Sequence, residues 1–193
     1  MKVNVQDYKK SIYEIGLDKD SEAVIWDFYV TKAICKSASQ KRSASDYGLS
    51  KLPYEEMLEV AGVDADNAVI LLADTMKETL KKLDLETEAG SGKNKHPIEI
   101  ETEECRFAII TPYRIADDKA PEAKCGKAES LLTHIRNALA HGNTYFFDDG
   151  KVMLEDKDSQ GKITARIIVK KETLFDWIRL IDFEERYYHI YRR

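Results

Sequence analysis

The sequence has no apolar run long enough to cross a membrane. Its longest, AVILLA, covers residues 68–73, whereas a spanning helix needs about 20 apolar residues. The initial segment MKVNVQDYKK lacks the apolar core of a secretory signal. Cysteine is scarce: Cys35, Cys105 and Cys125 are scattered, form no metal-spaced pair and cannot all pair within one chain. We therefore expect reduced thiols in a cytoplasmic protein.

Excess positive charge is also lacking, because the formal net charge is -5. This argues against a protein that coats DNA non-specifically. It leaves open an enzyme that grips RNA through one local basic cleft. With 43% hydrophobic and 34% charged residues, the 193-residue chain is typical of a globular protein. This length predicts a single domain over residues 1–193.

The first half of the chain shows helical patterns. Acidic and hydroxyl residues precede an apolar stripe within residues 20–37, which predicts a helix that begins near residue 20. The serine-rich, basic segment 36–50 is typical of a mobile loop. Pro53 can open a short helix through Val60. The clearest helical spacing of apolar residues lies in residues 65–83.

The middle of the chain is less regular. Residues 88–97 predict a loop, and their GSGK is no phosphate-binding loop because Thr87 stands where the first glycine is required. Residues 98–116 fit either a helix or a strand pair, and we favour the helix. After a turn around Pro121, a helix is predicted from Lys127 to His141.

Beyond Gly142 the apolar period changes to two. The segments TYFF, KVMLED and KITARIIV predict three short strands, the first two joined by a DDG turn. Thr173 and Asp176 fit a capping box for a last helix, whose buried stripe would be Leu174, Ile178, Ile181 and Tyr188. The predicted fold class is mostly α, a helical bundle with a small antiparallel β-meander before its C-terminal helix.

The segment LLTHIRNALAHGN, residues 131–143, carries the candidate site. On a helix, Asn137 and His141 lie four residues apart on one side, away from the apolar stripe, and Arg136 lies beside them. Gly142 is well placed to end the helix and to leave His141 in its last turn. A solvated helix face would show the same pattern, and chance alone gives roughly 0.2 such Arg–His spacings in a chain of this composition.

The segment RNALAHG, Arg136–Gly142, resembles the signature of the HEPN superfamily, in which Arg, often followed by Asn, precedes a His near the end of a bundle helix. The resemblance implies a HEPN-like helical bundle. It also implies a metal-independent endoribonuclease without cofactor, whose active site forms where two motif helices meet in a homodimer. Many members are toxins or phage-defence effectors held in check by an antitoxin or regulatory protein. Carried over by position, Arg136 and His141 are the catalytic pair, and Asn137 is the polar residue that accompanies them.

The resemblance has a limit and an alternative. Members paired with a nucleotidyltransferase antitoxin have a Tyr where this chain has Asn143, so that regulation is not implied.

For the implied homodimer, Ala138 and Ala140 are small and would let the motif helices of two protomers approach each other. The alternative is a non-catalytic HEPN-like module that binds a protein partner or a nucleotide.

Other polar residues have simpler explanations. His96, His134 and His189 form no metal set with His141, and we expect His134 on the surface. The pair Asp148 and Asp149 fits a turn better than a metal site.

The last predictions concern basic and aromatic residues. The tail RYYHIYRR, residues 186–193, interleaves both kinds and could contact RNA, although such tyrosines more often pack a helix onto its bundle. Lys36, Lys41 and Arg42 could line a substrate channel, but we favour a solvated loop.

Overall fold

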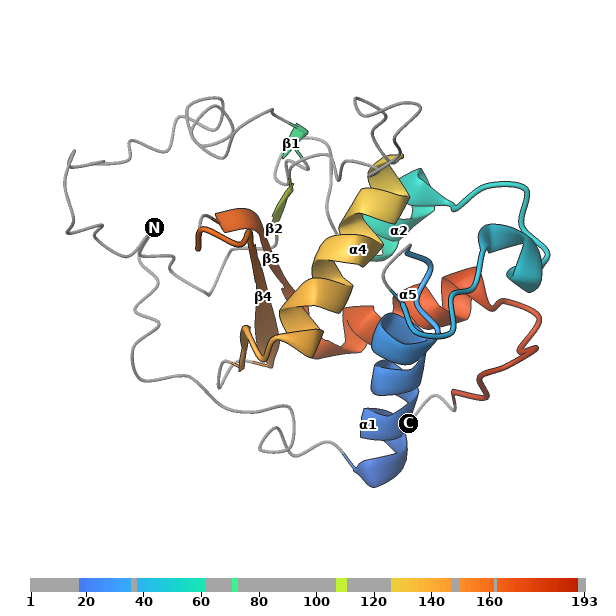
Figure 1. Ribbon diagram of the computed structural model, residues 1–193. Helices are drawn as coiled ribbons and strands as arrows, with labels where there is room; N and C mark the ends of the chain where they lie inside the picture. Colours follow the sequence, from blue (N-terminus) through green and yellow to red (C-terminus); the bar gives the residue numbers. More distant parts are fainter. Residues whose placement is uncertain are drawn as a thin grey trace, which may run out of the picture.

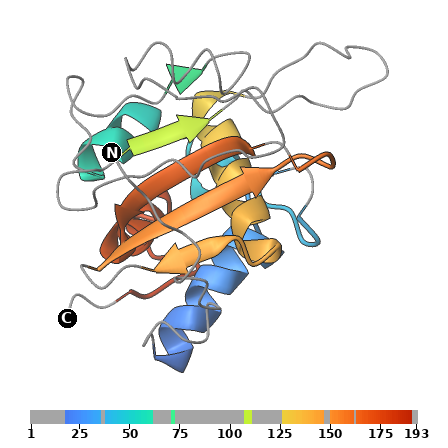
Figure 2. The ribbon, with the colours of Figure 1, turned by 90° about the vertical axis from the view of Figure 1, so that its left-hand side faces the viewer.

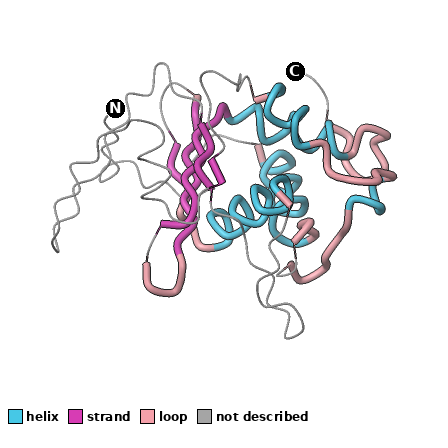
Figure 3. The backbone as a smooth tube through the Cα atoms, turned by 90° about the horizontal axis from the view of Figure 1, so that it is seen from above, coloured by secondary structure: helices cyan, strands magenta, loops and turns pink. Residues whose placement is uncertain are grey.

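The protein has a sheet packed on one side of a group of helices (Figures 1 and 3). The longest described helix, α4 (Lys127–Ala140), lies between the two, in contact with β4 (Lys151–Lys157) of the sheet and with the π-helical turn η2 (Asp27–Thr31). The structure is a computed structural model and describes residues 18–35, 38–61, 71–72, 107–110, 126–146, 150–161 and 163–190.

The first helix, α1 (Lys19–Trp26), begins where its sequence predicts. The Asp18 carboxylate caps it by accepting a hydrogen bond from a backbone N–H of the first turn. The helix continues as one π-helical turn, η2 (Asp27–Thr31), and ends earlier than the pattern in residues 20–37 suggests. It ends there because the chain folds back, and the Gln40 N–H donates to the Thr31 carbonyl at 2.9 Å.

The segment predicted as a mobile loop has structure of its own. A 3-10 turn, η3 (Ala44–Tyr47), forms in it, and the Ser43 and Asp46 side chains make a capping box. The predicted short helix after Pro53 is confirmed as α2 (Tyr54–Val60). Trp177 of the last helix donates its indole N–H to the Met57 carbonyl at 2.7 Å, which holds α2 against that helix.

The predicted meander is confirmed by three antiparallel strands, β3 (Thr144–Phe146), β4 (Lys151–Lys157) and β5 (Ile163–Lys170). Two further strands extend the sheet, β2 (Phe107–Ile110) antiparallel to β5 and β1 (Leu71–Leu72) parallel to β2. The strand order is β1-β2-β5-β4-β3, and Figure 2 shows α4 in yellow across one face of these strands.

These extra strands correct two expectations. The only described residues of the predicted helix over 65–83 form β1, and the favoured helix over 98–116 is wrong where β2 stands. Pairing along the sheet edge overrides the local helical spacing. The predicted loop 88–97, His96, Lys36 and the Asp148–Asp149 turn lie outside the described residues.

The last helix, α5 (Lys171–Ile181), starts two residues before the predicted cap. Its N-cap is Lys170, the last residue of β5, so Thr173 already lies inside the helix and is buried. The capping box of Thr173 and Asp176 is therefore wrong, because the strand runs into the helix without a turn. The predicted buried stripe of this helix is confirmed for Leu174, Ile178 and Ile181, each at most 2% exposed. Tyr188 is also buried, at 7% exposed, but it lies beyond the end of α5, so it is not part of a helical stripe.

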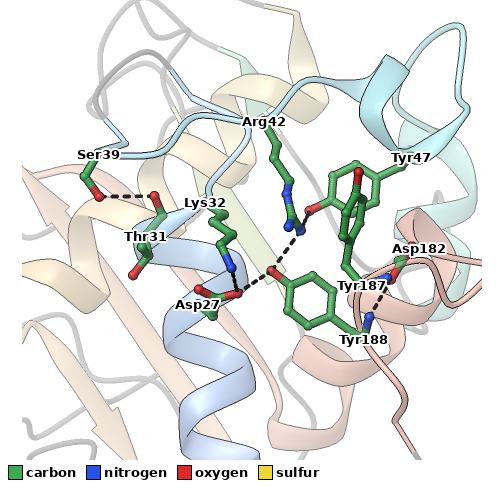
Figure 4. Close-up of polar contacts among 9 residues, drawn as sticks. All are labelled: Asp27, Thr31, Lys32, Ser39, Arg42, Tyr47, Asp182, Tyr187 and Tyr188. Carbon is green, nitrogen blue, oxygen red and sulfur yellow. Dashed lines mark hydrogen bonds and ion pairs between the residues drawn. The ribbon is translucent and has the colours of Figure 1, made fainter.

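The tail beyond α5 packs onto the bundle. The buried Asp182 carboxylate accepts the backbone N–H groups of Arg186, Tyr187 and Tyr188 at 2.8–3.0 Å. The Tyr188 hydroxyl donates to Asp27 at 3.0 Å (Figure 4). Burial raises the pKa of Tyr188 above its usual range, so its hydroxyl keeps the proton that it donates.

Arg42 joins this tail to the first half of the chain. Its guanidinium carbon lies 3.5 Å from the centre of the Tyr187 ring, and its Nη1 donates to the hydroxyls of Tyr47 and Tyr188 (Figure 4). Arg42 is half-buried. The prediction of a solvated loop is wrong for Arg42, whereas packing of the tail is confirmed at Tyr188.

The mostly α fold class is confirmed, with the antiparallel meander directly before α5. The main core lies between the sheet and the helices and includes Leu131, Ile135, Ile167, Trp177 and Ile178. None of the described helices is long and apolar enough to cross a bilayer.

Candidate active site at the end of helix α4

The C-terminal end of α4 is fixed by backbone hydrogen bonds. His141 is the C-cap, and Gly142 follows with a φ of 66°. The Gly142 N–H donates to the Leu139 carbonyl at 3.1 Å, and the Asn143 N–H donates to the Ala138 carbonyl at 2.9 Å. This pair of bonds is a Schellman motif. The helix therefore ends as its sequence predicts, with the His141 side chain exposed.

Replacing Gly142 by Ala is expected to destabilise the protein by about 1–2 kcal/mol, because only glycine adopts this left-handed conformation without strain. A Cβ at this position meets nothing within 4 Å, so backbone strain alone is tested. Thermal unfolding should show a melting temperature lower by about 2–8 °C. Gly142→Asn, which tolerates positive φ, should lose less. Equal losses in both variants would contradict this assignment.

Arg136 and Asn137 lie side by side in the last full turn, and both are half-buried. The Arg136 Nη1 donates to the Asn137 Oδ1 at 3.0 Å. The structure thus brings together two of the three predicted site residues. His141 follows Asn137 by about 6 Å along the helix axis and lies on the same side of the helix.

Asn137 connects this pair to the sheet. Its Nδ2 donates to the Oδ2 of Asp156 on β4 at 3.0 Å. The same oxygen lies 2.8 Å from the Nδ1 of His134, which is only 2% exposed. The expectation that His134 lies on the surface is therefore wrong, because the sheet covers that face of α4.

The sequence contained a signal for Asp156. Alternate residues of a strand share a face, so Asp156 continues the row of Val152 and Leu154, both fully buried. A carboxylate in the core row of a strand requires polar partners. His134 and Asn137 lie one turn apart on α4 and are those partners.

The described residues include no group of three His, Cys, Asp or Glu side chains that could hold a metal ion. Of the three cysteines, only Cys35 is described, and it is fully buried. The end of α4 offers instead a guanidinium, an amide and an exposed imidazole. This set can bind a phosphate and exchange protons near neutral pH.

A helical bundle whose central helix ends with Arg136, Asn137, His141 and Gly142 matches what the resemblance to the HEPN class implies. A family model described as HEPN pEK499 p136 matches residues 47–188, most of the chain, and the protein belongs to this HEPN family. The matched span includes α2, α4, the meander and α5. No curated protein and no solved structure matches the chain.

Proposed function

We propose that this HEPN protein is a metal-independent endoribonuclease of the toxin or phage-defence kind, which acts in the cytoplasm. The observation that supports it most is the end of α4. A glycine cap leaves His141 exposed, while Arg136 is held by the Asn137 side chain one turn earlier. Glycine caps end many helices, so the combination with the Arg136–Asn137 bond, and not the cap alone, favours a site.

The chemistry suits these residues. Cleavage of RNA without a metal needs a base for the 2′-hydroxyl and an acid for the leaving oxygen, and a histidine can serve either role near neutral pH. It also needs positive charge where the phosphate oxygens gain charge in the transition state, and the Arg136 guanidinium supplies it. Asn137 orients that guanidinium.

We propose that the active enzyme is a homodimer. His141 is five positions after Arg136, which places the two about 140° apart around the helix axis. A second copy of the helix end would bring one protomer's His141 to the other's Arg136 and would supply a second imidazole. Ala138 is fully buried and cannot contribute to this contact, contrary to its expected role. Ala140 is half-buried and lies on the accessible last turn.

Cleavage is expected to survive excess EDTA, because the proposed chemistry rests on His141 and Arg136 alone. The measurement is the initial rate of cleavage of a labelled single-stranded RNA by EDTA-treated protein, with and without added magnesium. Equal rates are expected. Activity that disappears with the chelator and returns with magnesium would contradict the proposed mechanism.

A non-catalytic module that binds a protein partner or a nucleotide is the alternative, and the acidic net charge favours it. Expression in bacteria separates the two functions. An active toxin should arrest growth, and His141→Ala should not, at equal levels of soluble protein. Growth arrest by both forms, or arrest by neither together with no cleavage by the purified protein, would favour the module.

A further inference from the structure

We propose that Asp156 and His134 are positioning residues for Arg136. Through Asn137, they would hold the guanidinium in one orientation for the substrate phosphate. This inference deepens the proposed ribonuclease function and rests on it. It concerns two residues that do not belong to the helix-end motif.

The contacts form a continuous chain from the core to the helix end. The Asp156 Oδ2 accepts hydrogen bonds from the His134 Nδ1 at 2.8 Å and from the Asn137 Nδ2 at 3.0 Å. The Asn137 Oδ1 accepts from the Arg136 Nη1 at 3.0 Å. Four side chains are thus joined by three hydrogen bonds, which run from a buried histidine to a half-buried arginine.

The chemistry of the two ends fixes the orientation of the amide between them. An ionised carboxylate only accepts hydrogen bonds, and a guanidinium only donates them. The Asn137 amide must therefore turn its NH₂ group to Asp156 and its oxygen to Arg136. Donation to a carboxylate also polarises the amide and makes its oxygen a better acceptor, so Asp156 strengthens the bond that holds Arg136.

The burial of the inner pair supports a fixed anchor. Asp156 is 5% exposed and His134 is 2% exposed. Burying a carboxylate is unfavourable unless hydrogen bonds compensate it. An apolar side chain would instead continue the row of Val152 and Leu154 on this strand. The buried carboxylate stands at the position on β4 that contacts Asn137. The free energy that its burial costs is therefore spent at the candidate site.

The test compares Asp156→Asn with Glu155→Gln. The neighbouring Glu155 is also 5% exposed, but alternation along β4 turns it to the other face of the sheet, and Lys157 pairs with it. Asp156→Asn keeps the shape and removes the charge. We expect it to lower kcat about 10- to 100-fold with little change in KM. Glu155→Gln should cleave at the wild-type rate.

A second measurement needs neither RNA nor activity. The guanidinium NMR signals of Arg136, assigned by their loss in Arg136→Lys, should be resolved in the wild-type protein and in Glu155→Gln. In Asp156→Asn the signals should lie closer together, because loss of the charge at position 156 weakens the bond from the Arg136 Nη1 to the Asn137 oxygen. If Asp156→Asn does not fold, Asn137→Ala removes that bond and leaves the inner pair in place, and it should bring the signals closer together still.

The two measurements separate the two proposals. Arg136 signals that lie closer together in the variants, without any RNA cleavage by the wild-type protein, would support the positioning of Arg136 and contradict the ribonuclease. Unchanged Arg136 signals in a folded Asp156→Asn or Asn137→Ala variant would overturn the positioning, whatever the activity. A loss of kcat as large in Glu155→Gln as in Asp156→Asn would overturn it as well.

Discussion

His141→Ala is expected to abolish RNA cleavage and to leave the melting temperature unchanged. The imidazole is exposed, and the structural contribution of this residue is its backbone N–H, which donates to the Asn137 carbonyl at 3.0 Å and remains in alanine. Loss of a general acid or base costs about 10²–10⁴-fold in rate. Arg136→Ala should lose cleavage to a similar extent, because it removes the charge that stabilises the transition state.

The matched control is His189→Ala. His189 is also exposed and lies outside α4, and its Nδ1 lies 3.2 Å from a carboxylate oxygen of the exposed Glu185. It should cleave RNA like the wild type. Thermal unfolding of each variant, followed by circular dichroism, distinguishes a lost reaction from a lost fold. Cleavage retained by His141→Ala would end the nuclease interpretation.

Leu139→Asp, two residues away from His141, is expected to unfold the protein. Leu139 is 5% exposed and belongs to the core between α4 and its neighbours. The substitution removes a buried apolar side chain and places a carboxylate in the core without a hydrogen-bond partner. Each change lowers the free energy of unfolding by several kcal/mol. The whole free energy of unfolding of such a protein is about 5–15 kcal/mol. Circular dichroism and urea titration measure the loss.

Leu139→Met is the control for this prediction. It keeps the volume and the apolar character of the side chain, so it should cost less than about 1.5 kcal/mol. A Leu139→Asp protein that melts cooperatively within a few degrees of the wild type would show that this face of the helix is not part of the core.

Local patterns predicted the elements that depend on local chemistry. The helical spacing of apolar residues predicted α4, and Gly142 predicted where it ends. Alternating residues located β4 and β5, which pair with each other. In each case, neighbours in the sequence supply most of what determines the element.

Elements that depend on distant partners were missed. Leu71 and Leu72 have helical spacing, but they pair with Ile109 and Ile110 in the sheet. Sequence spacing contains no information on that partner.

The same limit applied at the site. The helical pattern gave Arg136, Asn137 and His141 correct places at the end of α4. It assumed that the side of the helix opposite the apolar stripe faces solvent. The sheet covers part of that side and buries His134 against Asp156, which lies 22 residues away in the sequence. The alternation along β4 indicated a buried carboxylate at Asp156, but its partners His134 and Asn137 could be found only once the helix and the strand were placed together.

The most direct test of the ribonuclease is the chemistry of its cleavage products. Purified wild-type protein in EDTA is mixed with a single-stranded RNA and with the same RNA that carries one 2′-deoxy substitution at the cut site, and the ends are identified by mass spectrometry. Attack by the 2′-hydroxyl predicts an upstream product that ends in a 2′,3′-cyclic phosphate, and no cut at the deoxy position. Products with 3′-hydroxyl ends, or cleavage of the substituted RNA at that position, would contradict the proposed role of His141 and Arg136.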